Sequence, residues 1–520
     1  MGGPPARRGG RALRGAGAGT AGRRAVRARG RAGLRADGRR LRRADGRLGL
    51  RRDAGTRHPG RAGRHRQHVQ RCADRLLLPR RGPRREPGVK RPSPGGLWQD
   101  RDFLRLWAGE SVSQLGAQVT QLALPLAAVY QLHANSTQLG LLNAASYAPF
   151  LGLTLFIGVW ADRRRRRPLM IGANLGRALL VGTVPLCAAM GALTVWYLYL
   201  AALAIGVLTV VFDVSYQSYL PSLINTEQLV EGNSKLSVSN SVAQIGGPGL
   251  AGLLIGWLTA PLALLVNCAS YLVSVGTLST IRRREPAPEQ PAERVSTVRS
   301  IAEGLKVVLG NASIRAIALQ AGTYNLCWMS LQTVFVLYAS RLGMRPGTIG
   351  LVLGVGAVGS LLGAVGAARL KERLGLGRAV LAELLLCCCA PLLIPLAPGR
   401  GALSYALYVT AFGLCGLGST MATIHAVSLR QVITPPQLLG RVNAGCRFIA
   451  WGPLPLGALI GGRLGDTLGL RPTLWITAGT FLFALLWVAL SPVVRLRDFP
   501  TDLPHQRDAA ETGTAVPTPS

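Results

Sequence analysis

From Phe103 to Leu496 the sequence alternates apolar stretches of about 20 residues with short polar breaks. An α-helix rises ~1.5 Å per residue, so about 20 apolar residues cross a hydrocarbon layer ~30 Å thick. A β-barrel would show short strands of alternating hydropathy instead. The pattern therefore predicts an all-α membrane protein. Its twelve predicted transmembrane spans are 103–131, 138–160, 168–190, 194–218, 235–257, 261–281, 314–340, 347–368, 377–397, 402–427, 443–463 and 472–494.

The twelve predicted spans fall into two sets of six with related sequences. After the fourth span comes Ile224, then Asn233 and Gly247-Pro248; after the tenth comes Ile433, then Asn443 and Gly452-Pro453. The offset between matching residues stays between 205 and 210 positions. Several matches in order at a nearly constant offset predict two pseudo-symmetric six-helix halves. The predicted divisions are an extension at 1–99, helix bundles at 100–281 and 314–496, a cytoplasmic linker at 282–313 and a disordered tail at 497–520.

The distribution of basic residues predicts the orientation of the chain. Loops on the cytoplasmic side of a membrane carry an excess of Lys and Arg. If the N-terminus is cytoplasmic, the inner loops hold Arg163–Arg167, Arg282–Arg284 and many further basic residues. The first three outer loops, near His133, Gly191 and Ala260, hold none. We therefore expect both termini to face the cytoplasm of a cell whose plasma membrane holds the protein.

The first 99 residues differ in composition from the rest of the chain. They hold 29 of the 60 Lys and Arg residues and five of the 23 acidic ones, although the whole chain is only 16% charged. A segment of Arg, Gly, Ala and Pro buries too little apolar surface to fold, so we expect it to be disordered. Three interpretations stay open: translation from upstream of a true start near Val89, a natural disordered tail, or a basic arm that binds nucleic acid or anionic lipid.

Several patterns of soluble enzymes are missing from the sequence. There is no Gly-x-x-x-x-Gly-Lys-Ser/Thr loop to hold phosphates and no His-Glu-x-x-His zinc motif. Eight of the nine cysteines lie in apolar stretches, and none forms a Cys-x-x-Cys pair. We therefore predict that the protein is not an enzyme and uses no cofactor or metal.

The loop after the second predicted span carries a recognisable motif. It reads Gly158-Val-Trp-Ala-Asp162-Arg163-Arg-Arg-Arg166-Arg167. This resembles the signature loop of the major facilitator superfamily, Gly-x-x-x-Asp-Arg-x-Gly-Arg-Arg/Lys, except that an arginine replaces the second glycine. The resemblance implies a gate in which the acid caps a helix or binds an arginine while the cytoplasmic side is closed. The alternative is a simple cluster of cytoplasmic charge.

The fifth predicted span contains Gly246-Gly247-Pro248-Gly249-Leu-Ala-Gly252. It resembles the Gly-Pro-x-x-Gly-Gly motif of proton-coupled exporters in that superfamily, with an alanine in place of one glycine. Proline removes a backbone hydrogen bond, and glycines permit close helix packing. The resemblance therefore implies a helix that bends during transport. The alternative is a kink with a purely structural role. Stretches around Asp213 and Asn443 are similar to the branch that contains bacterial macrolide-efflux and enterobactin-exporter proteins.

Few ionisable residues lie inside the predicted spans, and such residues are costly unless they serve a function. Glu110 and Glu383 each lie about seven residues from a cytoplasmic end, or ~10 Å deep. We expect either carboxyl group to be able to carry a proton, with Glu383 the first choice. Asp213 and Arg447 could instead pair as part of a gate, and His425 could be a hydrogen-bonded interior residue. The candidate proton or charge-relay residues are Glu110, Arg177, Asp213, Glu383 and Arg447.

A further set of polar residues punctuates otherwise apolar spans. Gln114, Gln118 and Gln121 share one face of the first predicted helix, and Gln320 and Tyr324 are placed similarly on the seventh. A largely apolar cavity with scattered hydrogen-bonding groups suits a large amphipathic molecule; hydrogen bonding between helices is the alternative role. The candidate lining residues are Ser113, Gln114, Gln118, Gln121, Asn143, Tyr147, Gln320, Tyr324, Asn325, Trp328 and Gln332.

These features predict a monomeric secondary transporter, a proton-coupled exporter of amphipathic small molecules such as a drug, an antibiotic or a siderophore. Its expected partners are that substrate, protons and the lipid bilayer, and nucleic acid is not expected. An importer or lipid flippase of the same architecture is one alternative. A membrane-anchored basic binding protein, whose Arg-rich tail engages nucleic acid, is an alternative of another class.

Overall fold

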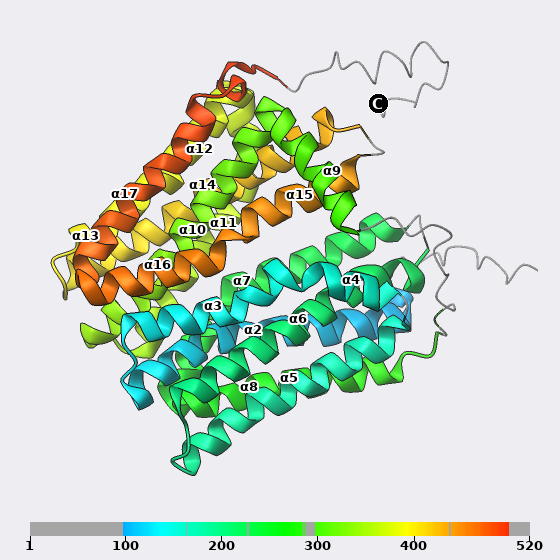
Figure 1. Cartoon of the computed structure of the whole chain (residues 1–520), viewed down its shortest axis with the longest axis vertical. Coiled ribbons are helices and arrows are strands. Elements are labelled where there is room, and N and C mark those ends of the chain that lie inside the picture. Colours follow the sequence, from blue (N-terminus) through cyan, green and yellow to red (C-terminus); the bar gives the residue numbers. More distant parts are fainter. Residues whose placement is uncertain are drawn as a thin grey trace, which may run out of the picture. The chain divides into compact units, whose positions relative to one another are not determined.

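The computed structural model describes residues 97–162, 164–225, 228–283, 285, 297–435 and 438–498 (Figure 1). All of them belong to the unit Lys90–Ser520. The predicted extension at 1–99 and the predicted tail at 497–520 therefore lie almost wholly outside the described residues, as does much of the predicted linker at 282–313. Within the described ranges the chain is helical and contains no strand.

The first seven α-helices form the N-terminal helix group, a name used below for residues 101–280. A short 3₁₀ helix, η1 (Leu97–Gln99), precedes them, and Asp100 caps the first of them through its carboxylate. The helices of this group are α2 (Arg101–Leu132), α3 (Ser136–Gly152), α4 (Thr154–Asp162), α5 (Arg166–Ala189), α6 (Val195–Leu223), α7 (Leu229–Leu258) and α8 (Ala260–Thr280).

The remaining helices follow the linker segment. Helix α9 (Thr297–Gly310) packs on the end of the C-terminal helix group, the name used below for residues 312–495. The members of this group are α10 (Ala312–Arg341), α11 (Pro346–Leu374), α12 (Leu376–Cys389), η3 (Ala390–Leu392), α13 (Leu393–Leu396), α14 (Ala402–Ile433), α15 (Leu439–Trp451), α16 (Pro453–Thr467), α17 (Leu470–Ala489) and η4 (Pro492–Arg495).

Each predicted span coincides with helix, but three of the predicted helices are interrupted. The range 138–160 is divided into α3 and α4, 377–397 into α12, η3 and α13, and 443–463 into α15 and α16. Pro391 lies in the second break and Pro453 begins the helix after the third. A proline has no N–H to continue the helical ladder, so these two breaks follow directly from the sequence.

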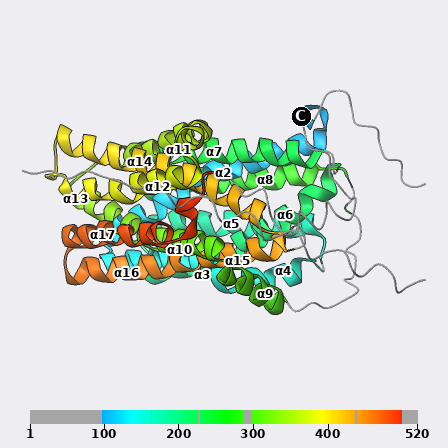
Figure 2. The same ribbon diagram turned by 90° about the horizontal axis from the view of Figure 1, so that it is seen from above.

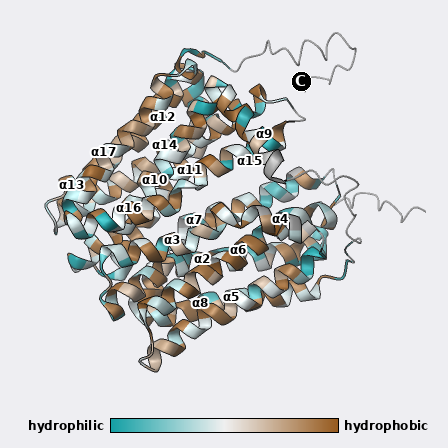
Figure 3. Cartoon of the chain, viewed as in Figure 1, coloured by the Kyte–Doolittle hydropathy of each residue, from teal (hydrophilic) through white to brown (hydrophobic). Residues whose placement is uncertain are grey.

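Seven helical segments of the described chain are long and apolar enough to cross a membrane by length and composition: α5, α6, α8, α11, α12–α13, α14 and α17. Helix α7 joins them as a bent span. Large apolar side chains point away from the protein, including Trp196, Trp257 and Leu490, which are 76%, 80% and 84% exposed. Hydrophobic residues follow the length of these helices in Figure 3. A surface of this kind is stable in lipid, so the protein is a multi-pass membrane protein.

The two helix groups contact each other mainly along two seams, between α7 and α11 and between α3 and α16 (Figure 2). Both seams contain glycine pairs in close backbone contact. A Cβ atom added to Gly252 would lie 2.9 Å from Cα of Gly350, and one added to Gly140 would lie 3.1 Å from Cα of Gly462. Small residues of this kind let membrane helices approach closely.

Candidate functional site

The N-terminal helix group buries a cluster of charged side chains. Glu110 of α2 is 7% exposed and Arg177 of α5 is 4% exposed. Gln114, one turn from Glu110, donates a hydrogen bond of 2.7 Å to its Oε1 atom, while Oε2 has no hydrogen-bond partner. Asp213 of α6 lies near enough for the charges of Arg177, Glu110 and Asp213 to interact. Helices α2, α5 and α6 thus bring together three of the predicted charge-relay residues.

Two aromatic rings lie close to the guanidinium group of Arg177. Its guanidinium carbon lies 4.5 Å from the ring centre of Phe212 on α6 and 4.5 Å from that of Tyr271 on α8. The guanidinium group also donates a hydrogen bond to the amide oxygen of Asn174, one turn away. Cation–π contacts are worth ~2 kcal/mol or more where the cation is desolvated. These contacts stabilise the Arg177 cation, whose neighbour one turn away, Asn174, is an amide and not a carboxylate.

Arg447 of α15 lies in a different setting. It is exposed, and its guanidinium carbon lies 4.9 Å from the ring centre of Trp451. Its charge still acts on Asp213 across the two groups, but none of the ion pairs between described residues joins these two side chains. The sequence-based hypothesis of an Asp213–Arg447 pair therefore does not describe this conformation.

Glu383 of α12 faces His425 of α14 in the interior of the C-terminal helix group. The two side chains are 0% and 4% exposed, and Nδ1 of His425 lies 3.0 Å from Oε1 and 3.1 Å from Oε2 of the carboxyl group. The sequence singled out each residue but not the pair, because the relative rotation of two helices cannot be read from their separate sequences.

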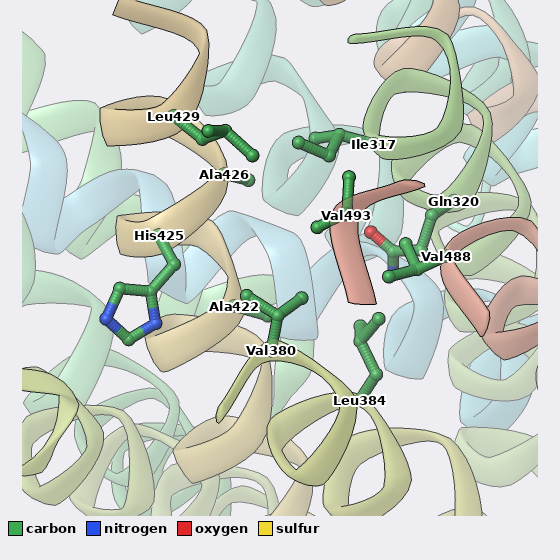
Figure 4. Close-up of a pocket in the computed structure, with 10 residues that line it drawn as sticks. All are labelled: Ile317, Gln320, Val380, Leu384, Ala422, His425, Ala426, Leu429, Val488 and Val493. Carbon is green, nitrogen blue, oxygen red and sulfur yellow. The ribbon is translucent and has the colours of Figure 1, made fainter. Parts of the chain in front are cut away.

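A small cavity adjoins this pair and is lined from several helices (Figure 4). Its volume is about 10 Å³. Besides His425 it contains one polar side chain, the predicted lining residue Gln320 of α10. The other lining residues are apolar: Ile317, Val380, Leu384, Ala422, Ala426, Leu429, Val488 and Val493.

One of the predicted lining residues forms a hydrogen bond between the two helix groups, and several others pack inside one group. Asn143 of α3 joins the two groups, because its amide donates a hydrogen bond of 2.9 Å to Thr333 of α10. Tyr324 and Trp328 of α10 stack on each other with ring centres 6.2 Å apart. Others pack inside one group: Ser113 is buried, Asn325 donates to the Ala450 carbonyl, and the Gln118 side chain fills the space beside Gly247. Gln121 is exposed, and Gln332 is half-buried.

Tyr147 belongs to an aromatic row that crosses the two groups. Its ring centre lies 6.4 Å from that of Phe150 on α3, and the Phe150 ring lies 5.9 Å from that of Trp451 on α15. Because Arg447 stacks on Trp451, the row ends in a cation. Rings and a cation on facing groups could contact an amphipathic ligand that lies between them.

Helix α7, which carries Gly247 and Pro248, is bent. The helix bends by 40° between Glu231–Gln244 and Gly246–Leu258. Pro248 causes such a bend because it cannot donate to the carbonyl of Gln244, four residues earlier. Gly252 lies against Pro346 and Gly350 of α11 in the other group, so its lack of a side chain permits close packing of the two helices.

The predicted gating loop is described only in part. Arg163 lies outside the described residues, and of Gly158 and Asp162 only the backbone is described. The carboxylate of Glu285 accepts the backbone N–H groups of Arg166 and Arg167, at 2.8 and 3.2 Å, and so caps α5. The Arg167 side chain donates to carbonyl groups at the end of α8. These contacts lie within the N-terminal helix group, and the sequence did not predict the role of Glu285.

A second unpredicted carboxylate joins the groups at the predicted outer end of the helices, the end that carries His133 and Leu468. Asp466 of α16 accepts hydrogen bonds of 2.9 Å from the backbone N–H groups of both Ser136 and Thr137 at the start of α3. Thr137 also donates to the Gly462 carbonyl. An anion is favourable at a helix N-terminus. In the sequence, the only sign of this contact was an acidic residue beside a loop that was predicted to face the cell exterior.

Replacing Asp466 with Asn should weaken the outer contact. An amide offers one acceptor oxygen and no charge, so one N–H of α3 loses its partner. Because Asp466 is exposed, we expect a loss of about 1 kcal/mol, or about fivefold in the ratio of closed to open outer ends. Distances between spin labels at His133 and Leu468 would measure it. Asn135→Ala, which removes the cap within α3, is the control and should leave this distance distribution unchanged; equal effects of the two variants would contradict the role of Asp466.

None of the described His, Cys, Asp and Glu side chains form a group of three that could hold a metal ion.

The sequence model of the Major Facilitator Superfamily matches residues 106–452. The curated relatives are distant but nearly full-length. Macrolide efflux protein A of Streptococcus pyogenes is 22% identical, with 74% of this chain and 94% of that protein covered. The multidrug efflux pump Tap of Mycolicibacterium fortuitum is 25% identical, with 74% and 93% covered. The enterobactin exporter EntS of Escherichia coli is 24% identical, with 76% and 93% covered.

Solved structures with the same fold include a bacterial homologue of the iron transporter ferroportin in an inward-facing state. It has a TM-score of 0.59 and 19% identity, with 75% of this chain and 98% of that chain covered. A bacterial homologue of the lysosomal transporter Spinster, also inward-facing, gives a TM-score of 0.56 and 14% identity, with 75% and 96% covered.

Proposed function

The chain belongs to the Major Facilitator Superfamily, and on this premise we propose that it is a secondary active exporter of amphipathic small molecules, driven by protons. The observation that carries the proposal is the burial of ionisable side chains at membrane depth, at Glu110, Arg177 and Glu383. Such residues in membrane helices mark proton and substrate pathways. The efflux function of three distant relatives supports the direction of transport.

We propose twelve spans in two six-helix halves, which the N-terminal and C-terminal helix groups represent. In this arrangement α3–α4, α12–α13 and α15–α16 are interrupted single spans. The excess of Arg and Lys in alternate loops supports an orientation with both termini in the cytoplasm. The loops at His133 and Leu468 then face the cell exterior.

In this orientation the contacts between the groups gather at the outer side. The hydrogen bonds between described residues of the two groups come from Tyr130, Ser136, Thr137 and Asn143, and Asn143 is ~10 Å along α3 from its outer end. The conformation is then closed to the exterior, and the groups separate there in the opposite state. Rocking of two halves about a central site is the alternating-access mechanism.

The chemistry between the groups favours a large amphipathic substrate. The Tyr147–Phe150–Trp451 row offers aromatic surface, Asn143 offers an amide, and Arg447 and Asp213 offer charges of both signs. Aromatic surface with a few polar groups binds drug-sized molecules. A drug, an antibiotic or a siderophore fits this description better than a sugar or a small ion.

A pH gradient imposed on inverted membrane vesicles tests the proposal. Vesicles that contain the protein and have an acidic lumen should accumulate an amphipathic dye such as ethidium, and a protonophore should abolish the uptake. Ethidium is a monovalent cation, so its one-for-one exchange with a proton moves no net charge and supports about a tenfold concentration ratio per pH unit. Uptake of a fluorescent lysolipid but not of dyes would indicate a flippase, and uptake in the opposite direction an importer.

A resistance and accumulation screen of a deletion strain would then identify the cargo. Deletion of residues 1–88 distinguishes the proposed exporter from the alternative, a membrane-anchored binding protein. The proposed exporter should keep its activity without this extension, whereas a protein that acts through its Arg-rich segment should lose its function.

A further inference from the structure

The Glu383–His425 pair lies apart from the seams between the two helix groups. Helix α12 packs mainly against α14 and α17 and has weaker contacts with η4, α11 and η3. Glu383 is seven residues from the start of α12, and His425 is eight residues from the end of α14, so both lie ~10–12 Å from the same end of the group. A substrate held between the groups would not touch this pair.

The pair is isolated from other charges. Other titratable groups in this part of the helix group are Tyr324 of α10 and the cysteines Cys387, Cys388, Cys389 and Cys415. Arg430, farther along α14, faces Cys446 of α15. Helix α17 has its arginine, Arg471, at the opposite end, bonded to the carbonyls of Pro395 and Ala397. Arg341 lies at the opposite end of α10 from Arg315. The other charged residues on the packed elements lie near the proposed cytoplasmic end: Arg315, Arg369, Lys371, Glu372, Arg373, Arg378 and Arg495.

The charge balance of the pair depends on one proton. With one proton shared between the carboxyl and imidazole groups, the pair has no net charge, whether the two groups are neutral or ionised together. Without that proton, one negative charge remains among the apolar side chains of α12, α14 and α17. A buried charge without a partner is costly, so the proton can leave only when water reaches the site.

The adjoining cavity provides a place for that water. Its volume of about 10 Å³ is close to what one water molecule occupies. Gln320 offers a hydrogen-bonding group on its wall, and His425 also lines it, with an imidazole ring that points away from the other lining side chains (Figure 4). Ile317 and Val493, also on the wall, belong to the first turns of α10 and to η4, near the proposed cytoplasmic end. Gln320 is on the helix that also carries Thr333, the hydrogen-bond partner of Asn143, and so connects the cavity with the region between the groups.

Close backbone packing links the pair to the seam. A Cβ atom on Gly418 of α14 would lie 2.4 Å from the Glu383 carbonyl oxygen, and one on Gly359 of α11 would lie 2.0 Å from the Gly413 carbonyl oxygen of α14. Helix α14 is therefore in tight contact with α12 on one side and α11 on the other. Since α11 meets α7 at Gly350, a movement of α14 relative to α12 is transmitted to the contact between the groups.

We propose that Glu383 and His425 together bind the proton exchanged for substrate, and release it to the cytoplasm through the cavity beside Gln320. The proton enters from external water in the outward-open state and leaves to cytoplasmic water in the state described, so no other reactant is needed. The substrate and the proton occupy separate places and are coupled through the packing of α12, α14 and α11. The inference rests on the proposed export function.

Infrared difference spectra of the purified protein in liposomes test proton binding without any substrate. Titration with pH should reveal a C=O band of a protonated carboxyl group that disappears as the pH rises. Glu383→Gln should remove this band, and His425→Gln should keep it with a shifted midpoint. Glu372→Gln, which changes an exposed carboxyl group on α11, is the matched control and should leave the band in place. Because Glu110 is a second buried carboxyl group, the spectrum of Glu383→Gln is subtracted from that of the wild type. A difference that contains no pH-dependent C=O band overturns the assignment.

The same variants in vesicles separate the site from the function. Glu383→Gln should lose the roughly tenfold accumulation per pH unit expected for one proton, yet retain exchange of labelled for unlabelled dye at equal pH. Accumulation that persists in Glu383→Gln while the wild type follows the gradient overturns the proposed site. If the wild type ignores the gradient while the infrared band depends on Glu383, the proposed coupling ion is wrong and the proton-binding site stands.

Discussion

A leucine at position 252 should prevent the two helix groups from closing at their outer ends. A Cβ atom there would lie 2.8 Å from the carbonyl oxygen of Pro346 and 2.9 Å from Cα of Gly350. Both are backbone atoms, which cannot move aside as a flexible side chain would. Overpacking typically costs 1–3 kcal/mol, and we expect about 3 kcal/mol here, which corresponds to more than 100-fold in the ratio of closed to open outer ends.

Spin labels at His133 and Leu468 measure this change, because both positions are exposed and lie on different groups. Gly252→Leu should move the distance distribution to larger values and abolish vesicle uptake of dye. Gly256→Leu is the matched control: it changes the same helix one turn away, where a Cβ atom meets nothing within 4 Å. Unchanged distances in a folded Gly252→Leu protein would show that the α7–α11 seam does not hold the outer ends together.

The effect of Gly252→Leu differs from the role that the sequence suggested for this glycine. By resemblance, Gly252 belonged to a motif that lets a helix bend. The bend occurs around Gln244–Gly246, where the missing N–H of Pro248 accounts for it, and Gly252 instead packs against α11. A motif read along one helix contains no information about the neighbouring helix, so the contact could not be predicted.

The positions of the helices were predictable for a simple physical reason. The thickness of a bilayer sets the length of an apolar helix, and every predicted range is indeed helical. The interruptions at Pro391 and Pro453 were visible as prolines, but the sequence did not show whether neighbouring helices would restore the broken hydrogen bonds. The sequence alone therefore predicts continuous spans.

Several predicted site residues lie inside helices of the two groups, and their partners were not foreseen. Glu383 and His425 are 42 positions apart, and Asp466 lies 330 positions from Ser136. Such contacts depend on helix rotation and register, which arise from packing of the whole protein. The tail at 1–99 and the acid of the gating loop, Asp162, stay predictions.

The largest loss of stability should follow the replacement of Arg177 with methionine. Methionine fills a similar space but removes the cation from beside Phe212 and Tyr271, whose ring centres each lie 4.5 Å from the guanidinium carbon. It also leaves Glu110 and Asp213 without the nearby positive charge. Removing one partner of a buried charge cluster costs about 3–5 kcal/mol. We expect a lower midpoint of thermal unfolding in detergent and no dye transport.

Two further variants separate charge from packing at Arg177. Arg177→Lys keeps the charge but not the planar group that stacks on both rings, so it should lose less stability than Arg177→Met. Adding Glu110→Gln to Arg177→Met should recover part of the stability, because the variant no longer buries a carboxylate without a counter-charge. The non-additive part of this double-mutant cycle measures the coupling between Glu110 and Arg177. Strictly additive effects would mean that Arg177 stabilises the protein through its aromatic contacts alone, and that the three charges do not form one functional cluster.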